Sequence, residues 1–235
     1  MINYKEIKLS EDRSYFSLGD HQPLWNKMFV EAGKFHSPGL APVKDDSGAY
    51  HIDTNGQPIY SVRYTRVFGY YGGIAGVQQG DQWFHILPDG SPLYKGNYRW
   101  VGNFQQNRCA VQDAEGYFLY IKEKEGIPLT QERYKYAGDF RESAAAVQLL
   151  NGRFTHIHHK GASLHGQEFL DLGVYHKGYA VAKDGTGWFH IDREGQAIYS
   201  HQFAQLEPFY NGWALAIDLK GKRLRVNEEG EIIML

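Results

Sequence analysis

Residues 187–195 read Gly-Trp-Phe-His-Ile-Asp-Arg-Glu-Gly, and Ile198 and Tyr199 follow them. The same phrase recurs at residues 83–94 and 50–60: an aromatic residue, His and Ile, then a turn Gly, then an apolar residue and Tyr. Two positions of this motif recur along the chain at intervals of 34 to 36 residues. The turn glycines are Gly56, Gly90, Gly126, Gly161, Gly195 and Gly230, and the closing apolar residues are Ile52, Ile86, Ile121, Ile157, Ile191 and Val226. A fixed period of this length predicts a repeat architecture.

Each period divides into four short segments that are rich in aromatic and β-branched residues and are separated by Gly, Asn-Gly or Asp-Gly turns. Such segments predict antiparallel hairpins. In residues 188–191 both faces of the strand are mostly apolar, which indicates a small sheet covered on both sides by its neighbours. We therefore predict an all-β repeat protein, a six-bladed β-propeller with compact blades of about 35 residues. An open, solenoid-like stack of hairpins is the alternative.

The repeat also predicts how the chain is divided. Residues 1–14 are a polar N-terminal cap, residues 15–28 match the second half of a repeat, and residues 29–235 hold six full repeats. We expect one domain over residues 1–235, since no linker or charge block interrupts the period. The apolar end at residues 232–235 would be an exposed edge unless it pairs with the N-terminal segment, a second copy or a further domain.

Composition excludes several classes of protein. Lys and Arg total 25 against 27 Asp and Glu, which argues against nucleic acid as a partner. No apolar run approaches the length of a membrane helix, and residues 1–8 lack the apolar core of a signal peptide. Cys109 is the single cysteine and occupies a small-residue strand position, so we expect a buried thiol and a reducing, cytoplasmic setting.

The pattern Gly-x-Ala-x-Val, a turn glycine, aromatic-x-x-Ile-Asp and a second glycine resembles the bacterial WG-repeat family, with clear copies at residues 178–195 and 40–56. The position after the aromatic, usually glycine in that family, is Phe84, Leu119, Thr155 or Phe189 here. The spacing of the motif is also similar to that of the short repeats of quinoprotein-type propellers. The resemblance implies a propeller that serves as a binding module, and no catalytic residue carries over by motif.

Four histidines recur at one position of the repeat: His51, His85, His156 and His190. Because they repeat with the fold, we interpret them as a structural polar layer that bonds a neighbouring repeat. Tyr120 and Arg225 fill the same position elsewhere. The triplet His156, His158 and His159 is the best candidate for metal ligands, but we predict no metal site and no cofactor.

Residues that the repeat does not share are better candidates for function, because the fold does not require them. Trp100 and Trp213 are such residues, and interfaces favour Trp. Arg66, Tyr98 and Arg99 lie in the connecting segments and are expected on the same binding surface.

The hypothesis for function is a non-enzymatic scaffold that binds a protein partner or a fused domain, since nucleophile elbows, phosphate loops and zinc-protease motifs are missing. A carbohydrate-binding propeller is the alternative, because exposed aromatics can stack on sugars. A third hypothesis is an enzyme with an axial site made from the histidines.

Overall fold

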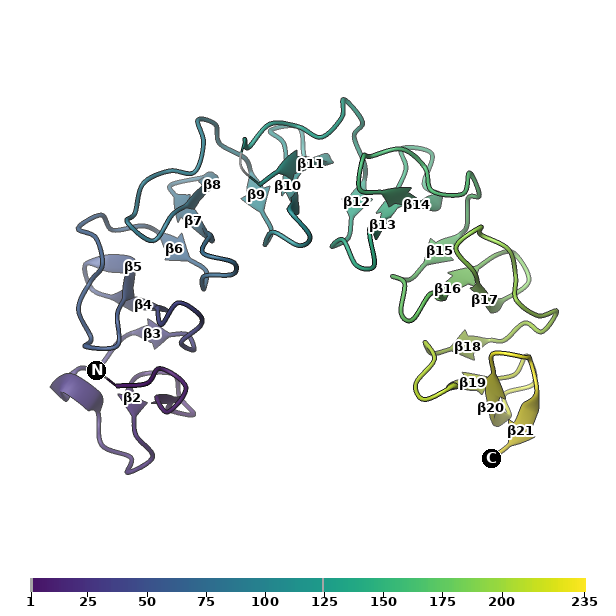
Figure 1. Cartoon of the computed structure of the whole chain (residues 1–235), viewed down its shortest axis with the longest axis horizontal. Coiled ribbons are helices and arrows are strands. Elements are labelled where there is room, and N and C mark those ends of the chain that lie inside the picture. The colour runs from purple at the N-terminus through teal and green to yellow at the C-terminus, as the bar shows by residue number, and fades with distance from the viewer. Residues whose placement is uncertain (1, 124) are drawn as a thin grey trace. The chain divides into compact units, whose positions relative to one another are not determined.

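The computed structural model describes residues 2–123 and 125–235, and strands make up nearly all of its regular structure (Figure 1). Over these residues each full repeat forms one antiparallel sheet: a strand of two residues, then a hairpin of two strands of four or five residues. The first three sheets are β3 (Glu31–Ala32), β4 (Ala41–Asp45) and β5 (Gly48–Ile52); β6 (Arg66–Val67), β7 (Ala75–Gln79) and β8 (Gln82–Ile86); and β9 (Trp100–Val101), β10 (Arg108–Gln112) and β11 (Phe118–Lys122).

The next three sheets follow the same plan. They are β12 (Tyr136–Ala137), β13 (Ala144–Gln148) and β14 (Phe154–His158); β15 (Asp171–Leu172), β16 (Ala180–Lys183) and β17 (Trp188–Ile191); and β18 (Gln205–Leu206), β19 (Trp213–Ile217), β20 (Arg223–Asn227) and β21 (Ile232–Met234). The prediction of an all-β propeller-type repeat with six small sheets is confirmed, since each sheet is a blade of the predicted length.

The fourth segment of the repeat is a single bridge in most repeats. Ile86 pairs with Pro92, and Ile191 with Ala197, before the chain leaves for the next repeat. The last repeat alone has a full fourth strand among the described residues, where β21 pairs with β20 through Val226 and Ile232. The apolar C-terminal segment is therefore paired on one side, within its own sheet.

The N-terminal residues contain a strand that their polar composition does not predict. β1 (Lys8–Leu9) pairs with β2 (Phe16–Ser17), and a 3-10 turn, η1 (Leu24–Asn26), follows. Ile7 is buried in the same core cluster as Phe16, so residues within the predicted cap are part of a packed two-stranded sheet.

The chain divides into two compact units. Unit 1 is residues 1–104, 111–116 and 121–127, and unit 2 is residues 105–110, 117–120 and 128–235. The division runs through β10 and β11, inside the third repeat. In both units the buried clusters are rich in aromatic and small residues, such as Tyr70, Ala75 and Val77 in unit 1 and Tyr175, Ala180 and Ala182 in unit 2, and each of these clusters also includes residues of the preceding repeat.

Successive repeats are joined by backbone pairing at the aromatic position. Trp83 pairs with Tyr98, and Trp188 with Phe203, the first residue of the next repeat. Trp83 is buried, as a fold-bearing position requires. Cys109 is also buried, as expected from its strand position. In the described part of the chain, no helix has the length and apolarity to cross a membrane.

Candidate functional site

The four recurrent histidines form the most regular polar feature of the fold. Their side chains are at most 1% exposed, and each lies at the boundary between its own repeat and the next. The Nε2–H of each ring donates to a backbone carbonyl 17 residues further on. The acceptors are Phe68 at 2.7 Å from His51, Gly102 at 2.9 Å from His85, Gly173 at 2.9 Å from His156 and Glu207 at 3.0 Å from His190.

The other ring nitrogen, Nδ1, has a partner nine residues further on. Tyrosine hydroxyls donate to it in three repeats, and a histidine nitrogen takes that place in the fourth. The partners are Tyr60 at 2.5 Å, Tyr94 at 2.7 Å, Tyr199, and His165 at 3.2 Å. Because Nε2 donates and Nδ1 accepts, each ring is a neutral imidazole that carries its proton on Nε2.

An aromatic ring of the next repeat covers each histidine. His51 packs on Tyr70 with ring centroids 4.5 Å apart, and His190 stacks on Phe209 at 3.9 Å. Burial lowers the pKa of all four histidines to about 4, although the bond to the carbonyl opposes that shift. These histidines are therefore neutral links between repeats.

The third repeat makes the same link with a different residue. Tyr120 occupies the histidine position, and its hydroxyl donates directly to the carbonyl of Gly138 at 2.5 Å. Its ring packs on Phe140 with centroids 4.9 Å apart. The residue nine positions on is Leu129, since a phenol needs no second donor. In the last repeat Arg225 lies over the ring of Trp213, 4.5 Å from its centroid.

The histidine triplet does not converge on a common point. Both ring nitrogens of His156 are hydrogen-bonded, one to His165 and one to the carbonyl of Gly173. Nδ1 of His158 accepts from the backbone amide of Lys160 at 2.9 Å. Over residues 2–123 and 125–235, no three His, Cys, Asp or Glu side chains are grouped so as to hold a metal ion.

Two of the residues predicted for binding are largely structural. The hydroxyl of Tyr98 donates to the carbonyl of Gly126 at 3.2 Å, and its backbone pairs with Trp83. Trp213 begins β19 in unit 2, is half-buried and carries Arg225 on its face. Trp100 and Arg99 are exposed on and beside β9, and Trp100 pairs in register with Gln112.

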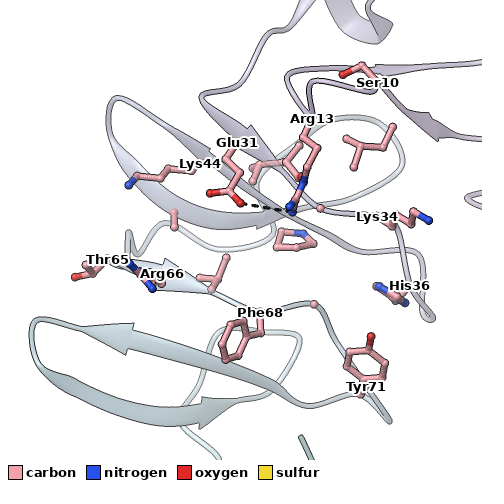
Figure 2. A pocket seen from close by; sticks show the side chains of 18 of the residues that line it. Ser10, Arg13, Glu31, Lys34, His36, Lys44, Thr65, Arg66, Phe68 and Tyr71 are labelled. Atoms are coloured by element: carbon pink, nitrogen blue, oxygen red, sulfur yellow. Dashed lines mark hydrogen bonds and ion pairs between the residues drawn. The ribbon is translucent and has the colours of Figure 1, made fainter. Parts of the chain in front are cut away.

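Arg66 is the predicted site residue that lies in a cavity. A groove of about 990 Å³ in unit 1 is lined by residues 9–13 of the N-terminal cap and by segments of the first two full repeats (Figure 2). We call it the basic groove. The side chains that matter for its chemistry are Arg13, Glu31, Lys34, His36, Lys44, Arg66, Phe68 and Tyr71.

Positive charge dominates the basic groove. Its lining has four Lys or Arg side chains and two Glu side chains, in a chain whose net charge is −2. Arg13 is paired with Glu31 at 3.5 Å, the dashed line in Figure 2. Lys34, Lys44 and Arg66 are exposed, and no carboxylate of the described residues lies within ion-pair distance of them. The groove therefore favours an anionic ligand.

Aromatic rings border the same groove. Phe68 is 37% exposed and stacks on Trp83 with centroids 4.9 Å apart, which fixes its orientation. Tyr71 is 43% exposed and packs against His36 at 5.0 Å. Rings held in this way offer apolar contact area at little cost in conformational entropy.

Sequence reasoning missed most of this groove. Arg66 stands at a repeat position whose residues are exposed and differ from repeat to repeat: Glu31, Arg66, Trp100, Tyr136, Asp171 and Gln205. This variation between repeats is the feature of the sequence that could have indicated a binding surface, and it also singles out Trp100. Lys34 and Lys44 carried no signal, because solvated charge is the ordinary interpretation of a surface lysine.

Two segments of the chain match a known repeat, and the second of them contains His190. The family described as "WG containing repeat" matches residues 52–83 and 188–222. These two segments are similar to the WG repeat. The second match begins at Trp188, the aromatic position of the phrase, so the resemblance found in the sequence is confirmed. No curated protein matches the chain.

Several solved structures are similar to this chain at low sequence identity. The computationally designed Ika8 protein has a TM-score of 0.50 and 13% identity, over 96% of this chain and 81% of that chain. BamB from Moraxella catarrhalis has a TM-score of 0.49 and 13% identity, over 89% and 74%. The C-terminal WD40 domain of Sif2 has a TM-score of 0.43 and 8% identity, over 88% and 68%.

Proposed function

We propose that the chain is a non-catalytic interaction module that binds a protein partner through the basic groove. The observation that carries this proposal is the gathering of Lys34, Lys44 and Arg66, none with an ion-pair partner among the described residues, beside two exposed aromatic rings. Arg and aromatic residues are typical of those that dominate binding energy in interfaces, and the two lysines add positive charge that attracts an acidic partner. The fold requires none of these side chains at these positions.

The histidine links support the non-catalytic part of the proposal. General acid–base catalysis needs a group that reaches the substrate and titrates near the working pH. His51, His85, His156 and His190 are buried, both nitrogens of each ring are bonded, and their pKa is about 4. A cytoplasmic setting, expected from the single cysteine, belongs to the same proposal.

A peptide selection tests the proposal. A random-peptide phage library is selected on the immobilised full chain, and the enriched peptides are measured against the Lys34→Glu/Arg66→Glu variant. The control is Arg153→Glu/Lys160→Glu, which makes the same charge change at exposed residues of unit 2. We expect roughly tenfold or greater loss of affinity in the groove variant and less than about twofold in the control.

Circular dichroism melts of both variants show whether they remain folded. Failure of the library to enrich any groove-dependent peptide overturns the proposal. If a glycan array binds the parent chain and loses that binding in the groove variant, the carbohydrate alternative replaces it, with Phe68 and Tyr71 as the stacking residues.

A further inference from the structure

A tight four-residue turn leads into the hairpin of the second to sixth full repeats, and we call residues 71–74, 105–108, 141–144, 176–179 and 210–213 the rim turns. In each, the first and last residues exchange backbone hydrogen bonds, as Tyr71 and Ile74 do at 2.9 and 3.1 Å. The two central residues have left-handed backbone angles, with φ of 59° and 82° at Gly72 and Gly73. Their amides take no part in the turn's own bonds and form a small concave donor site.

Unit 2 shows what such a turn binds. The carboxylate of Glu142 accepts from the amide of Lys177 at 2.7 Å and from the amide of Gly178 at 2.9 Å, both central residues of the next rim turn. Burial of Glu142 opposes ionisation, but these two amides, together with the nearby His176 and Arg141 side chains, lower its pKa. The side-chain oxygen of Gln106 accepts from Ser143 at 2.9 Å in the same way.

The rim turn at 71–74 has the same geometry and is not filled by the chain. No hydrogen bond from the amides of Gly72 or Gly73 is made within the described residues. A Cβ added at either glycine would meet nothing within 4 Å, so the turn is open. Glu142 is the second residue after Phe140, and the second residue after Phe35 is Ser37, which has no carboxylate to offer.

The open turn continues directly from the basic groove. Tyr71, its first residue, lines the groove, together with His36 and Lys34. β6, which also contributes to the lining, is the edge strand of its sheet, whereas the edge of β3 is already bonded to Arg13 through Ala32. An outer strand can pair with an extended peptide but has no equivalent interaction with a sugar chain.

We propose that Gly72 and Gly73 bind a carboxylate of an acidic peptide segment that lies in the basic groove. The proposal rests on the proposed function and names the chemistry of the partner. One Asp or Glu side chain, or a C-terminal carboxylate, takes the place that Glu142 takes at Lys177 and Gly178. Further carboxylates of the segment face Lys34, Lys44 and Arg66.

Nuclear magnetic resonance tests the contact directly. The full chain, labelled with ¹⁵N-glycine, is titrated with a capped hexaglutamate peptide, and the Gly72 and Gly73 signals are assigned from single Asn variants. Hydrogen bonding to a carboxylate deshields an amide proton, so we expect both signals to move downfield and to saturate. Gly178 is the internal control, because Glu142 already occupies it and its signal should stay in place.

A matched pair of variants tests the affinity. Asn and Asp both tolerate the backbone angle at Gly72, and there is room for either side chain. Gly72→Asn should leave the dissociation constant of hexaglutamate within about twofold, whereas Gly72→Asp should raise it roughly tenfold by repelling the carboxylate. Equal effects of the two substitutions would contradict the proposal.

The remaining outcomes separate this inference from the proposed function. If hexaglutamate binds but the Gly72 and Gly73 signals do not move, or if the phage library enriches only non-acidic peptides, the carboxylate site is wrong and the interaction module stands. Binding of polygalacturonate without binding of hexaglutamate overturns the peptide as occupant. Absence of peptide binding in both experiments overturns both proposals.

Discussion

A buried histidine is stable in this fold because both ring nitrogens have partners at fixed offsets along the chain. In the last complete link, His190 donates to Glu207 and accepts from Tyr199. Leaving one buried polar atom unsatisfied costs more than the bond contributes. The residue at the link and the residue nine positions later therefore depend on each other. His occurs with Tyr or a second His, and Tyr120 occurs with Leu129.

This dependence predicts a rescue in the third repeat. Tyr120→His should lower the free energy of unfolding by about 1–3 kcal/mol, because Leu129 offers no donor to Nδ1. Adding Leu129→Tyr should recover about 1 kcal/mol, while Leu129→Tyr alone should give no gain. Urea unfolding of the three variants and the parent measures the coupling. Strictly additive effects would show that the two positions are independent.

At the scale of the element, the turn glycine of each repeat is also a contact with the repeat before it. At Gly90 an added Cβ would lie 2.8 Å from Cγ of Tyr60, and at Gly230 it would lie 2.9 Å from Cβ of Tyr199. Both glycines have left-handed φ, 81° and 83°. The same tyrosines donate to His51 and His190, so in these repeats His, Tyr and Gly together join one repeat to the next.

Two glycines of the last repeat distinguish the energetic cost of the contact with Tyr199 from the cost of the left-handed backbone angle. Gly230 and Gly221 share a φ of 83°, but a Cβ at Gly221 would meet nothing within 4 Å. Gly221→Ala should cost about 1 kcal/mol for its backbone angle alone. Gly230→Ala should cost roughly 1–3 kcal/mol more, because Tyr199 must move in a packed interface. Thermal and urea unfolding of the pair measure this difference, and equal losses would rule out the contact.

The elements were predictable where one repeat contains all the information. The aromatic-His-Ile segments are strands β5, β8, β14 and β17, and the period places them correctly. β1 was missed because its pairing with β2 depends on Ile7 and Leu9 packing near Phe16, which a polar composition conceals. The groove was missed for a similar reason. Its cations come from separate segments, and only Arg66 differs visibly from its repeat equivalents.

At the scale of the whole molecule, the links make stability depend on pH. The pKa of His51, His85, His156 and His190 is about 4 in the folded chain and close to 6.5 once unfolded. Above pH 6.5 the imidazoles are neutral in both states and their contribution is complete. Between pH 6.5 and 4 the unfolded chain binds protons that the folded chain cannot, so stability falls as the pH falls.

We expect a loss of about 2 kcal/mol per histidine at pH 5, which for all four is comparable with the whole stability of an ordinary domain. Urea unfolding between pH 7.5 and 4.5 should therefore show a midpoint that is flat above pH 6.5 and falls steeply below it.

His190→Gln keeps a donor for the carbonyl of Glu207 and an acceptor for Tyr199 but cannot titrate. This variant should show a slope that is shallower by about one proton, because unfolding then exposes one group fewer to protonation. An unchanged slope would mean that His190 is already protonated in the folded chain, and a carbonyl at Nε2 with a tyrosine hydroxyl at Nδ1 gives that charge no counterion.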